Sequence, residues 1–137
     1  MQSIKPKWIK RIFVLILVIF ISYILYLNSL VKSQFASEIA PKDNVVQIQN
    51  LIDDYPKELI NMLLLVEDQS FFNHKGVDFK EILRVLYGYL FEEKELRGAS
   101  TITQQLIKNT LLSRDKTLAR KTDEALMAIL MEMSYDK

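Results

Sequence analysis

The stretch from Glu67 to Gly76 holds the residues of this chain that are best suited to chemistry. It reads Glu-Asp-Gln-Ser-Phe-Phe-Asn-His-Lys-Gly, so two adjacent carboxylates precede two aromatic residues and the only histidine. Apolar residues recur upstream at helical spacing, and Glu67 falls four residues after Leu63, on the apolar side of a helix predicted to start near Pro56. A carboxylate there would lose hydration, which suits it to proton transfer. The simpler interpretation is a helix-terminal acid paired with a lysine.

A second polar cluster follows farther along the chain. From Gly98 to Asn109 the sequence reads Gly-Ala-Ser-Thr-Ile-Thr-Gln-Gln-Leu-Ile-Lys-Asn, and it places Gln104, Gln105 and Lys108 on one face of a predicted helix. Amides and an ammonium on one face can hold sugar hydroxyls or a phosphate. A solvated helix face would have the same composition, so this cluster alone leaves binding and solvation open.

The third cluster is Arg120-Lys-Thr-Asp-Glu124, with Arg120 at i and Lys121 at i+1 of a helix and Glu124 at i+4. An ordinary ion pair on a helix surface has the same spacing. The sole histidine, His74, cannot form a metal site by itself, because metal sites need several ligands. We therefore expect His74 to have a hydrogen-bonded structural role.

An apolar run from Ile12 to Val31 is the first element that must position these clusters. A helix of about 20 apolar residues crosses roughly 30 Å of hydrocarbon, and this run is nearly all Ile, Leu, Val and Phe. Four Lys and Arg residues precede it, which predicts a cytoplasmic amino end and an extracytoplasmic remainder. The alternative is a cleaved signal peptide. The run is longer than a usual signal core and no small-x-small site follows it closely, so we predict an uncleaved signal anchor.

The predicted organisation has four parts: residues 1–11 form a cytoplasmic basic tail, 12–31 a transmembrane anchor, 32–53 a stalk and 54–137 a partial globular domain. The stalk has one apolar cluster, at residues 45–52, whose period does not decide between strand and helix. Acidic residues slightly outnumber basic ones beyond the anchor, so the outer part has no basic field suited to nucleic acid. The absence of cysteine fits an extracytoplasmic chain that needs no disulfides.

Helical patterns with few strand signals predict an all-α fold for the outer part. Capping residues mark the helix starts at Asp78, at Ser100 or Thr101, and at Thr117. The helix from Asp78 is expected to end near Glu93. Three sets of residues are expected to face the interior: Phe79, Ile82, Leu83, Leu86, Tyr89 and Leu90 in that helix, Ile102, Leu106 and Ile107 in the next, and Leu118, Leu126, Ile129, Leu130 and Met133 in the last.

Together the three clusters resemble glycosyltransferase family 51, the glycosyltransferase domain of class A penicillin-binding proteins and monofunctional transglycosylases. Glu67-Asp68-x-x-Phe71-x-x-His74-x-Gly76 is similar to its first motif, Gly98-x-Ser-Thr-Ile-Thr-Gln-Gln-Leu-x-Lys-Asn109 to its second and Arg120-Lys-x-x-Glu124 to its third. The resemblance covers roughly residues 53–137 and implies a lysozyme-like, mostly helical fold. The family's fourth and fifth motifs do not occur, so we expect the amino-terminal part of such a domain.

The resemblance implies polymerisation of lipid II through β-1,4 linkages, with release of undecaprenyl diphosphate. Glu67 would be the general base that takes a proton from the acceptor's 4-hydroxyl, and Glu124 would be a second carboxylate near the donor. Three cations would offset the charge of the diphosphate: Lys108, Arg120 and Lys121. The other residues expected to bind substrate or shape the cleft are Ser100, Gln104, Gln105, Asn109 and Arg84.

No cofactor is expected to be required, and the resemblance names Glu124 as the candidate ligand for a divalent cation, magnesium or manganese. The expected partners are lipid II, the growing glycan chain, the membrane and other cell-wall synthesis or division proteins. The expected location is the bacterial cell membrane. The alternative function is a non-catalytic remnant that binds lipid-linked substrate or partner enzymes. A membrane-anchored helical adapter is a third interpretation, which three matched motifs disfavour.

Overall fold

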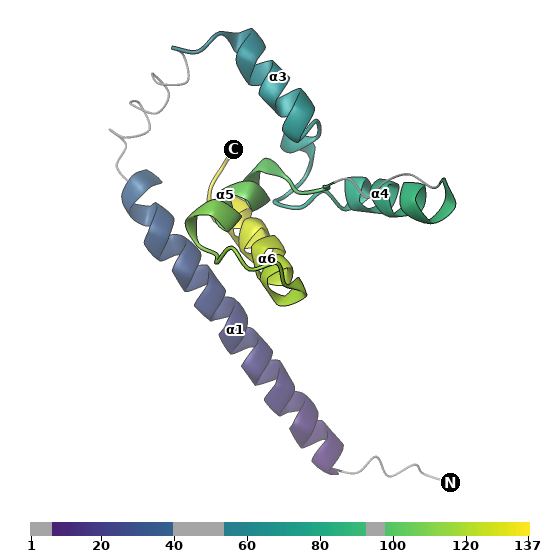
Figure 1. The fold of residues 1–137 in the computed structure, drawn as a ribbon. Helices are drawn as coiled ribbons and strands as arrows, with labels where there is room; N and C mark the ends of the chain where they lie inside the picture. Colours follow the sequence, from purple (N-terminus) through teal and green to yellow (C-terminus); the bar gives the residue numbers. More distant parts are fainter. Residues whose placement is uncertain (1–6, 40–53, 93–97) are drawn as a thin grey trace.

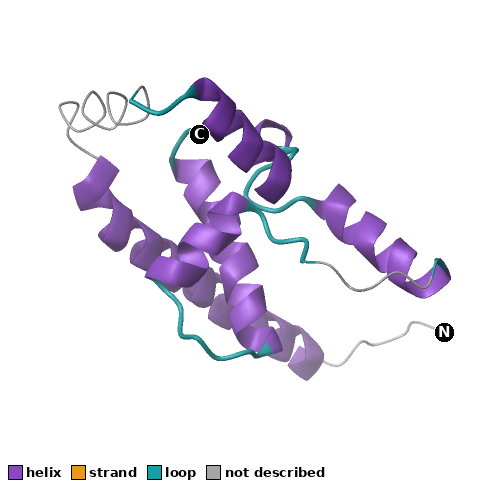
Figure 2. Ribbon diagram, turned by 45° about the horizontal axis from the view of Figure 1, so that its top comes forward, coloured by secondary structure: helices purple, strands orange, loops and turns teal. Residues whose placement is uncertain are grey.

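The computed structural model describes residues 7–39, 54–92 and 98–137, and within them the chain is built from helices (Figure 1). In chain order these are α1 (Lys7–Ile39), α3 (Lys57–Glu67), the short 3-10 helix η1 (Phe71–Asn73), α4 (Phe79–Phe91), α5 (Ile102–Thr110) and α6 (Leu118–Ser134). The described residues contain no strand, only an isolated β-bridge between Lys75 and Val77 (Figure 2). The predicted all-α class is therefore confirmed. The apolar cluster of the predicted stalk, residues 45–52, lies outside the described residues.

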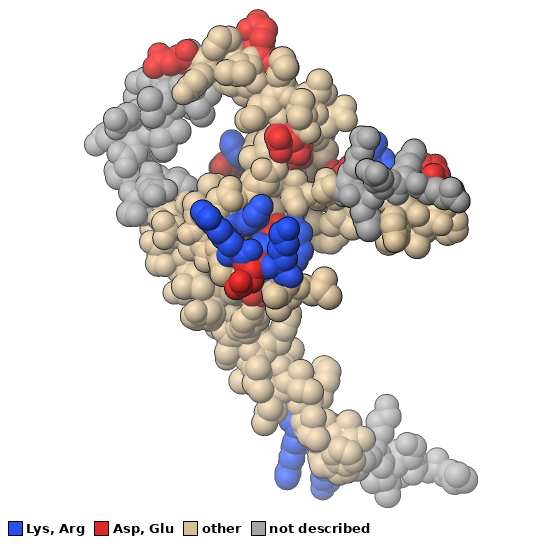
Figure 3. Space-filling model, in the orientation of Figure 1, with Lys and Arg blue, Asp and Glu red and all other residues tan. Residues whose placement is uncertain are grey.

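Helix α1 is unbroken and extends past the apolar run. Its part from Lys7 to Ala36 is long and apolar enough to cross a membrane, and basic side chains lie at its amino end (Figure 3). Most large apolar side chains from Trp8 to Tyr26 are exposed, and burial begins at Leu27. The last turns of α1 therefore pack against the rest of the protein.

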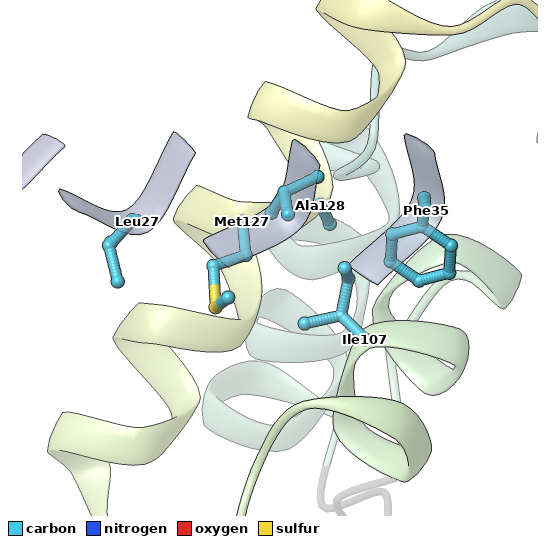
Figure 4. Packing of buried hydrophobic residues seen from close by; sticks show 6 residues of the cluster. Leu27, Phe35, Ile107, Met127 and Ala128 are labelled. Atoms are coloured by element: carbon cyan, nitrogen blue, oxygen red, sulfur yellow. The ribbon is translucent and has the colours of Figure 1, made fainter. Parts of the chain in front are cut away.

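The apolar core lies where α1, α5 and α6 meet (Figure 4). Residues spaced every four positions share one side of a helix, and Leu27, Val31 and Phe35 of α1 follow this rule. The six buried side chains of the core are Leu27, Val31, Phe35, Ile107, Met127 and Ala128. Full burial of a large apolar side chain stabilises the folded state by about 1.5–3 kcal/mol. This three-helix bundle therefore holds most of the apolar burial that the described residues provide.

The predicted capping residues begin the helices that follow. Asp78 accepts a hydrogen bond of 2.9 Å from the N–H three residues on, at the start of α4. Thr101 forms a capping box with Gln104 at the start of α5, in which both hydrogen bonds measure 3.1 Å. Thr117 caps α6 by accepting a 3.1 Å bond from the N–H of Arg120. Each cap satisfies a backbone donor that the helix leaves unpaired and contributes about 1 kcal/mol.

The buried face of α6 differs from the predicted one. Met127 and Ala128 are buried, whereas Leu118 and Met133, which the pattern places inside, are exposed. Apolar residues occupy more than one face of α6, and the positions of α1 and α5 decide which face is covered. The remaining residues of the predicted set, Leu126, Ile129 and Leu130, are half-buried.

Helix α5 follows its prediction more closely. Ile107 is fully buried and Ile102 is half-buried, as expected, but Leu106 is exposed. Leu106 and Ile107 are neighbours about 100° apart around a helix. The core therefore covers only the side that carries Ile107.

The apolar faces of α3 and α4 are exposed. No residue of α3 is buried, and Gly88 is the only buried residue of α4. The prediction of an interior face for α4 is wrong, because all six of its residues are exposed: Phe79, Ile82, Leu83, Leu86, Tyr89 and Leu90. Helix α4 projects away from α1, α5 and α6 (Figure 1), and the extensive helix–helix contacts among the described residues join α6 to α5 and to α1. Helix α4 ends at Phe91, close to the predicted end.

Candidate functional site

The first motif is joined to α6 by its glycine. Gly76 has a φ of +79°, a conformation that glycine adopts without the penalty of a side chain. A Cβ there would lie 2.5 Å from the backbone of Ala128 in α6. The carbonyl of Gly76 also accepts a 2.6 Å hydrogen bond from the hydroxyl of Thr101. The end of the first motif is therefore held against both α6 and the start of α5.

The second carboxylate of the first motif, Asp68, is buried and ties three segments together. Its oxygens lie 2.9 and 3.0 Å from Nε2 of His74, and Oδ2 accepts a 3.1 Å bond from the backbone N–H of Ile102. Both side chains of the Asp68–His74 pair are at least nine-tenths buried. The prediction that His74 is a hydrogen-bonded structural residue is confirmed. Asp68 fixes the loop after α3 to the first turn of α5.

The first carboxylate, Glu67, is exposed at the last position of α3. The expectation that it loses hydration on an apolar face is wrong, because α3 has no buried face for it to share. Its Oε2 accepts a 2.8 Å hydrogen bond from the side-chain amide of Gln105 in α5. Within the described residues no hydrogen bond reaches Oε1. Glu67 is therefore oriented on one side and open on the other.

Glu67 lines a pocket of about 590 Å³. The pocket lies between the end of α3, the start of α4 and residues 98–101, which precede α5. Three of the predicted site residues line it, namely Glu67, Arg84 and Ser100. Its volume is within the range of small-molecule sites, and the first two clusters of the sequence therefore meet around one cavity.

The third cluster reaches this pocket through Ser100. The Lys121 ammonium donates a 2.6 Å bond to the Ser100 hydroxyl and also contacts Glu124. Arg120 pairs with the other oxygen of Glu124 at 2.9 Å. Glu124 is 1% exposed, so this cluster is not an ordinary surface ion pair. The Lys121 side chain is 45% exposed, and it is the cation of this pair that is open to a ligand beside the pocket.

Basic side chains gather around acidic ones over this part of the molecule (Figure 3). Arg120 and Lys121 carry two positive charges against the one negative charge of Glu124. Within this cluster the positive charges therefore outnumber the negative ones by one.

The remaining predicted site residues lie at different distances from the pocket. Gln104 is buried, and its side chain is used in the capping box of α5. Lys108 and Asn109 are exposed on α5 and do not line the pocket. Arg84 is exposed at the pocket, where it pairs with Glu81 at 2.6 Å. That carboxylate raises the pKa of Arg84.

The lining of the same pocket includes Asp78, an acid that the motifs did not single out for binding. The Ser70 hydroxyl donates to the Asp78 carboxylate, and this bond, together with the N–H of Glu81, lowers the pKa of Asp78. The pocket thus carries several negative side chains beside Arg84, its one cationic lining residue in the described part of the chain. The Lys121 ammonium of α6 is not part of the lining and contacts it through the Ser100 hydroxyl.

Among the described residues, the surroundings of Glu124 leave it no carboxylate oxygen free for a divalent cation. Among the residues that the structure describes, no group of three or more His, Cys, Asp or Glu side chains converges. Both oxygens of Glu124 already contact cationic side chains. We therefore assign no step to a metal at Glu124.

Sequence reasoning missed the contacts that join the clusters. The bond from Gln105 to Glu67, the bond from Ile102 to Asp68 and the approach of Gly76 to α6 each connect residues far apart in the chain. The helical periodicity of a sequence does not predict contacts between residues on different helices. The sequence indicated only that most of these residues belong to the three motifs.

Comparisons with known proteins identify the family of the chain. A family described as Transglycosylase matches residues 32–137. The chain is 39% identical to penicillin-binding protein 1B of Haemophilus influenzae, in an alignment of 114 positions that covers 78% of this chain and 15% of that protein. It is 37% identical to penicillin-binding protein 1F of Bacillus subtilis, over 83% of this chain and 16% of that protein. A third relative, penicillin-binding protein 1A of Aquifex aeolicus, is 43% identical over 63% of this chain and 12% of that protein.

The chain spans between about an eighth and a sixth of the length of these relatives. The match covers all three motifs and the whole pocket, because every residue of both lies between 32 and 137. The chain belongs to the transglycosylase family, the family that its motifs resemble.

Proposed function

We propose that the chain is a peptidoglycan glycosyltransferase, which polymerises lipid II into β-1,4-linked glycan strands and releases undecaprenyl diphosphate. The pocket carries this proposal. Its lining includes the Glu67 carboxylate and the Ser100 hydroxyl, which accepts a bond from Lys121. The reaction needs a base for the acceptor and a cation for the leaving diphosphate. The pocket is lined by the base, and its lining residue Ser100 contacts the cation.

Glu67 acts as the general base. Gln105 orients the carboxylate through Oε2, and the open oxygen accepts the proton of the acceptor's 4-hydroxyl. As that proton leaves, the hydroxyl oxygen attacks the anomeric carbon of the donor. The bond from that carbon to the diphosphate oxygen breaks, and the configuration inverts. Because Glu67 is exposed, its orientation supports this role rather than the loss of hydration that the sequence suggested.

Lys121 neutralises the diphosphate as it departs. Its ammonium is half-exposed beside Ser100, whereas Arg120 is largely buried against Glu124. Glu124 is then a positioning residue that holds both cations. Lys108 and Asn109 lie outside the pocket, and we assign them no role at the reacting atoms.

The proposed location is the bacterial cell membrane, crossed once by α1. The basic amino end of α1 would remain in the cytoplasm and the pocket would lie outside. A tethered enzyme and a lipid-anchored substrate both diffuse in two dimensions, which raises the frequency of their encounters.

Polymerisation of labelled lipid II by the full chain in lipid nanodiscs tests the proposal. The Glu67→Gln variant is compared with the parent and with Glu58→Gln, which changes an exposed acid in the first turn of the same helix. We expect Glu67→Gln to lose at least about 100-fold in rate, the usual contribution of a general base. Glu58→Gln should polymerise at the parent's rate.

Two results would contradict the proposal. Parent-like polymerisation by Glu67→Gln would remove Glu67 as the base. If the folded parent binds labelled lipid II but forms no strands, the chain is a non-catalytic binding protein, which is the alternative function. Binding is measured in the same nanodiscs by the anisotropy of the labelled lipid.

A further inference from the structure

The segment after α6 carries a lysine that the sequence did not single out. Lys137 lies three residues beyond the end of α6, at the point marked C in Figure 1, and its side chain is only 16% exposed. An ammonium has three N–H donors, and three oxygens surround this one. It donates to the backbone carbonyls of Phe71 and His74, to the latter at 2.7 Å. It also lies 3.0 Å from Oε2 of Glu132.

The two carbonyls belong to the loop that follows the proposed base. Glu67 is the last residue of α3, and backbone hydrogen bonds connect the end of this helix to the loop. The N–H of Asp68 donates to the carbonyl of Leu64 at 2.9 Å, and the N–H of Phe71 donates to the carbonyl of Asp68 at 3.0 Å. The Phe71 carbonyl then accepts from Lys137. A series of hydrogen bonds therefore runs from the last turn of α3 to this ammonium.

The ring of Phe71 adds a further contact to the same ammonium. The Lys137 nitrogen lies 4.4 Å from the ring centroid, within the distance over which a cation is attracted to an aromatic face. The ring in turn meets Phe72 edge-on, with centroids 5.0 Å apart. Lys137 therefore holds both the backbone and the side chain of Phe71.

Glu132 connects the ammonium to α5. Its Oε1 accepts a hydrogen bond from the Thr103 hydroxyl, and its side chain is 6% exposed. Thr103 lies two residues before Gln105, whose amide donates to Glu67 at 2.8 Å. The loop after the base and the helix that carries the base's partner are thus bound to one ion pair. A shift of either would disturb the bond between Gln105 and Glu67.

We propose that Lys137 is a positioning residue for the transfer reaction. It holds the loop from Asp68 to Gly76 against the end of α6 and thereby keeps Glu67 aligned with Gln105. The observation behind this is the largely buried ammonium that two loop carbonyls and a carboxylate surround. Lys137 does not line the pocket, so its loss should slow the chemical step without weakening the binding of substrate. The inference rests on the proposed function of Glu67.

The test removes the ion pair as a unit. Lys137→Met alone would leave the Glu132 carboxylate buried without a cation, which can unfold a protein. The double variant Glu132→Gln, Lys137→Met leaves neither charge unpaired. Polymerisation of labelled lipid II by the full chain in nanodiscs is measured over a range of substrate concentrations. We expect kcat to fall at least about tenfold and KM to stay within about twofold, because a displaced catalytic group affects the transition state and not the binding of substrate. An unchanged kcat would overturn the proposal.

Two further variants separate positioning from a general loss of structure. Lys137→Arg keeps a cation with several N–H donors, so it should retain at least about half of the parent's kcat. Lys75→Met removes an exposed lysine from the same loop and should match the parent. If Lys137→Arg is as slow as the double variant, or if Lys75→Met is equally slow, the assignment is wrong.

Hydrogen exchange separates this inference from the proposed function. The N–H groups of Phe71 and Asn73 donate to the carbonyls of Asp68 and Ser70 within the loop. They should exchange at least about tenfold faster in the double variant, because the loop then opens locally, whereas the amide of the buried Met127 should exchange as in the parent. Equal loop exchange in the two proteins would show that Lys137 does not hold the loop. If the exchange changes as expected but the parent forms no strands, the proposed function fails, the positioning role fails with it, and only the contact with the loop stands.

Discussion

The bundle of α1, α5 and α6 and the arm formed by α3 and α4 are held in different ways. In the bundle, side chains from three helices share one buried cluster. In the arm, neither helix buries a large side chain, and the exposed residues are mainly apolar. The arm is instead joined to the bundle by the buried polar contacts of Asp68 and by the close approach of Gly76.

This difference separates the two chemical roles. The proposed base, Glu67, stands on the arm, whereas the proposed cation, Lys121, stands on the bundle. The site therefore exists only while the join between the two regions is intact. Variants of the residues that join arm and bundle, Asp68 and Gly76, should therefore change the free energy of unfolding by other amounts than variants within the bundle or within the arm.

The largest loss of stability is expected for Gly76→Ala. A Cβ would meet the backbone of Ala128 at 2.5 Å, and the φ of +79° disfavours a side chain. We expect the free energy of unfolding to fall by about 4 kcal/mol, measured by urea denaturation in detergent with circular dichroism. Gly98→Ala is the control, because nothing lies within 4 Å of its added Cβ. Equal urea midpoints of unfolding for the two variants would contradict the close contact between Gly76 and the backbone of Ala128.

Removal of core volume should distinguish the bundle from the arm. Ile107 is fully buried in α5, and Leu83 is exposed on α4. Ile107→Ala should cost about 3 kcal/mol through lost burial and the cavity left behind. Leu83→Ala should change the free energy of unfolding by no more than about 0.5 kcal/mol. A comparable cost for both, in the same urea titration, would mean that the arm has a packed face of its own.

The buried carboxylate at the join is tested by Asp68→Asn. The amide retains one acceptor oxygen, so the bond to Ile102 and the contact with His74 cannot both be kept as they are. We expect a cost of about 2 kcal/mol and faster hydrogen exchange at the Ile102 amide. Asp115→Asn, an exposed acid in the loop before α6, serves as the control. Unchanged exchange at Ile102 would show that Asp68 does not hold the start of α5.

The smallest effect is expected for the pH dependence of the local stability of α4. The pKa of Asp78 is lowered in the folded chain by Ser70 and by the capped N–H, so its ionised form stabilises the helix. This contribution is present above the carboxylate's ordinary pKa and is lost as the pH falls through the lowered one. Acidification should therefore speed hydrogen exchange in α4, with about 1 kcal/mol at stake. Asp78→Asn keeps a capping side chain but should lose this dependence; an identical pH profile would contradict the assignment.

Local chemistry explains what was predicted correctly from the sequence. The caps at Asp78, Thr101 and Thr117 act within three residues, so their types and spacing suffice to place the helix starts. The all-α class follows from the same short-range signals. Of the predicted site residues, only Glu67, Arg84 and Ser100 line the pocket.

Burial could not be predicted in the same way. Leu118 and Met127 are both apolar residues of α6, yet one is exposed and the other buried, because α1 and α5 cover only one face. Leu27 and Val31 read as membrane residues but pack in the core. Glu67 reads as a carboxylate on an apolar face, and that face is uncovered. Each case depends on a neighbour far away in the chain.

The rate of polymerisation at saturating lipid II tests most directly the claim that arm and bundle together form one site. Lys121→Met, from the bundle, is compared with Glu67→Gln, from the arm, and with Lys80→Met, an exposed lysine of α4. We expect the first two to lose at least about 100-fold, since one removes the base and the other removes charge stabilisation of the leaving group. Lys80→Met should match the parent. Polymerisation at the parent's rate by Lys121→Met would contradict the account, because the bundle would then supply no charge to the reaction.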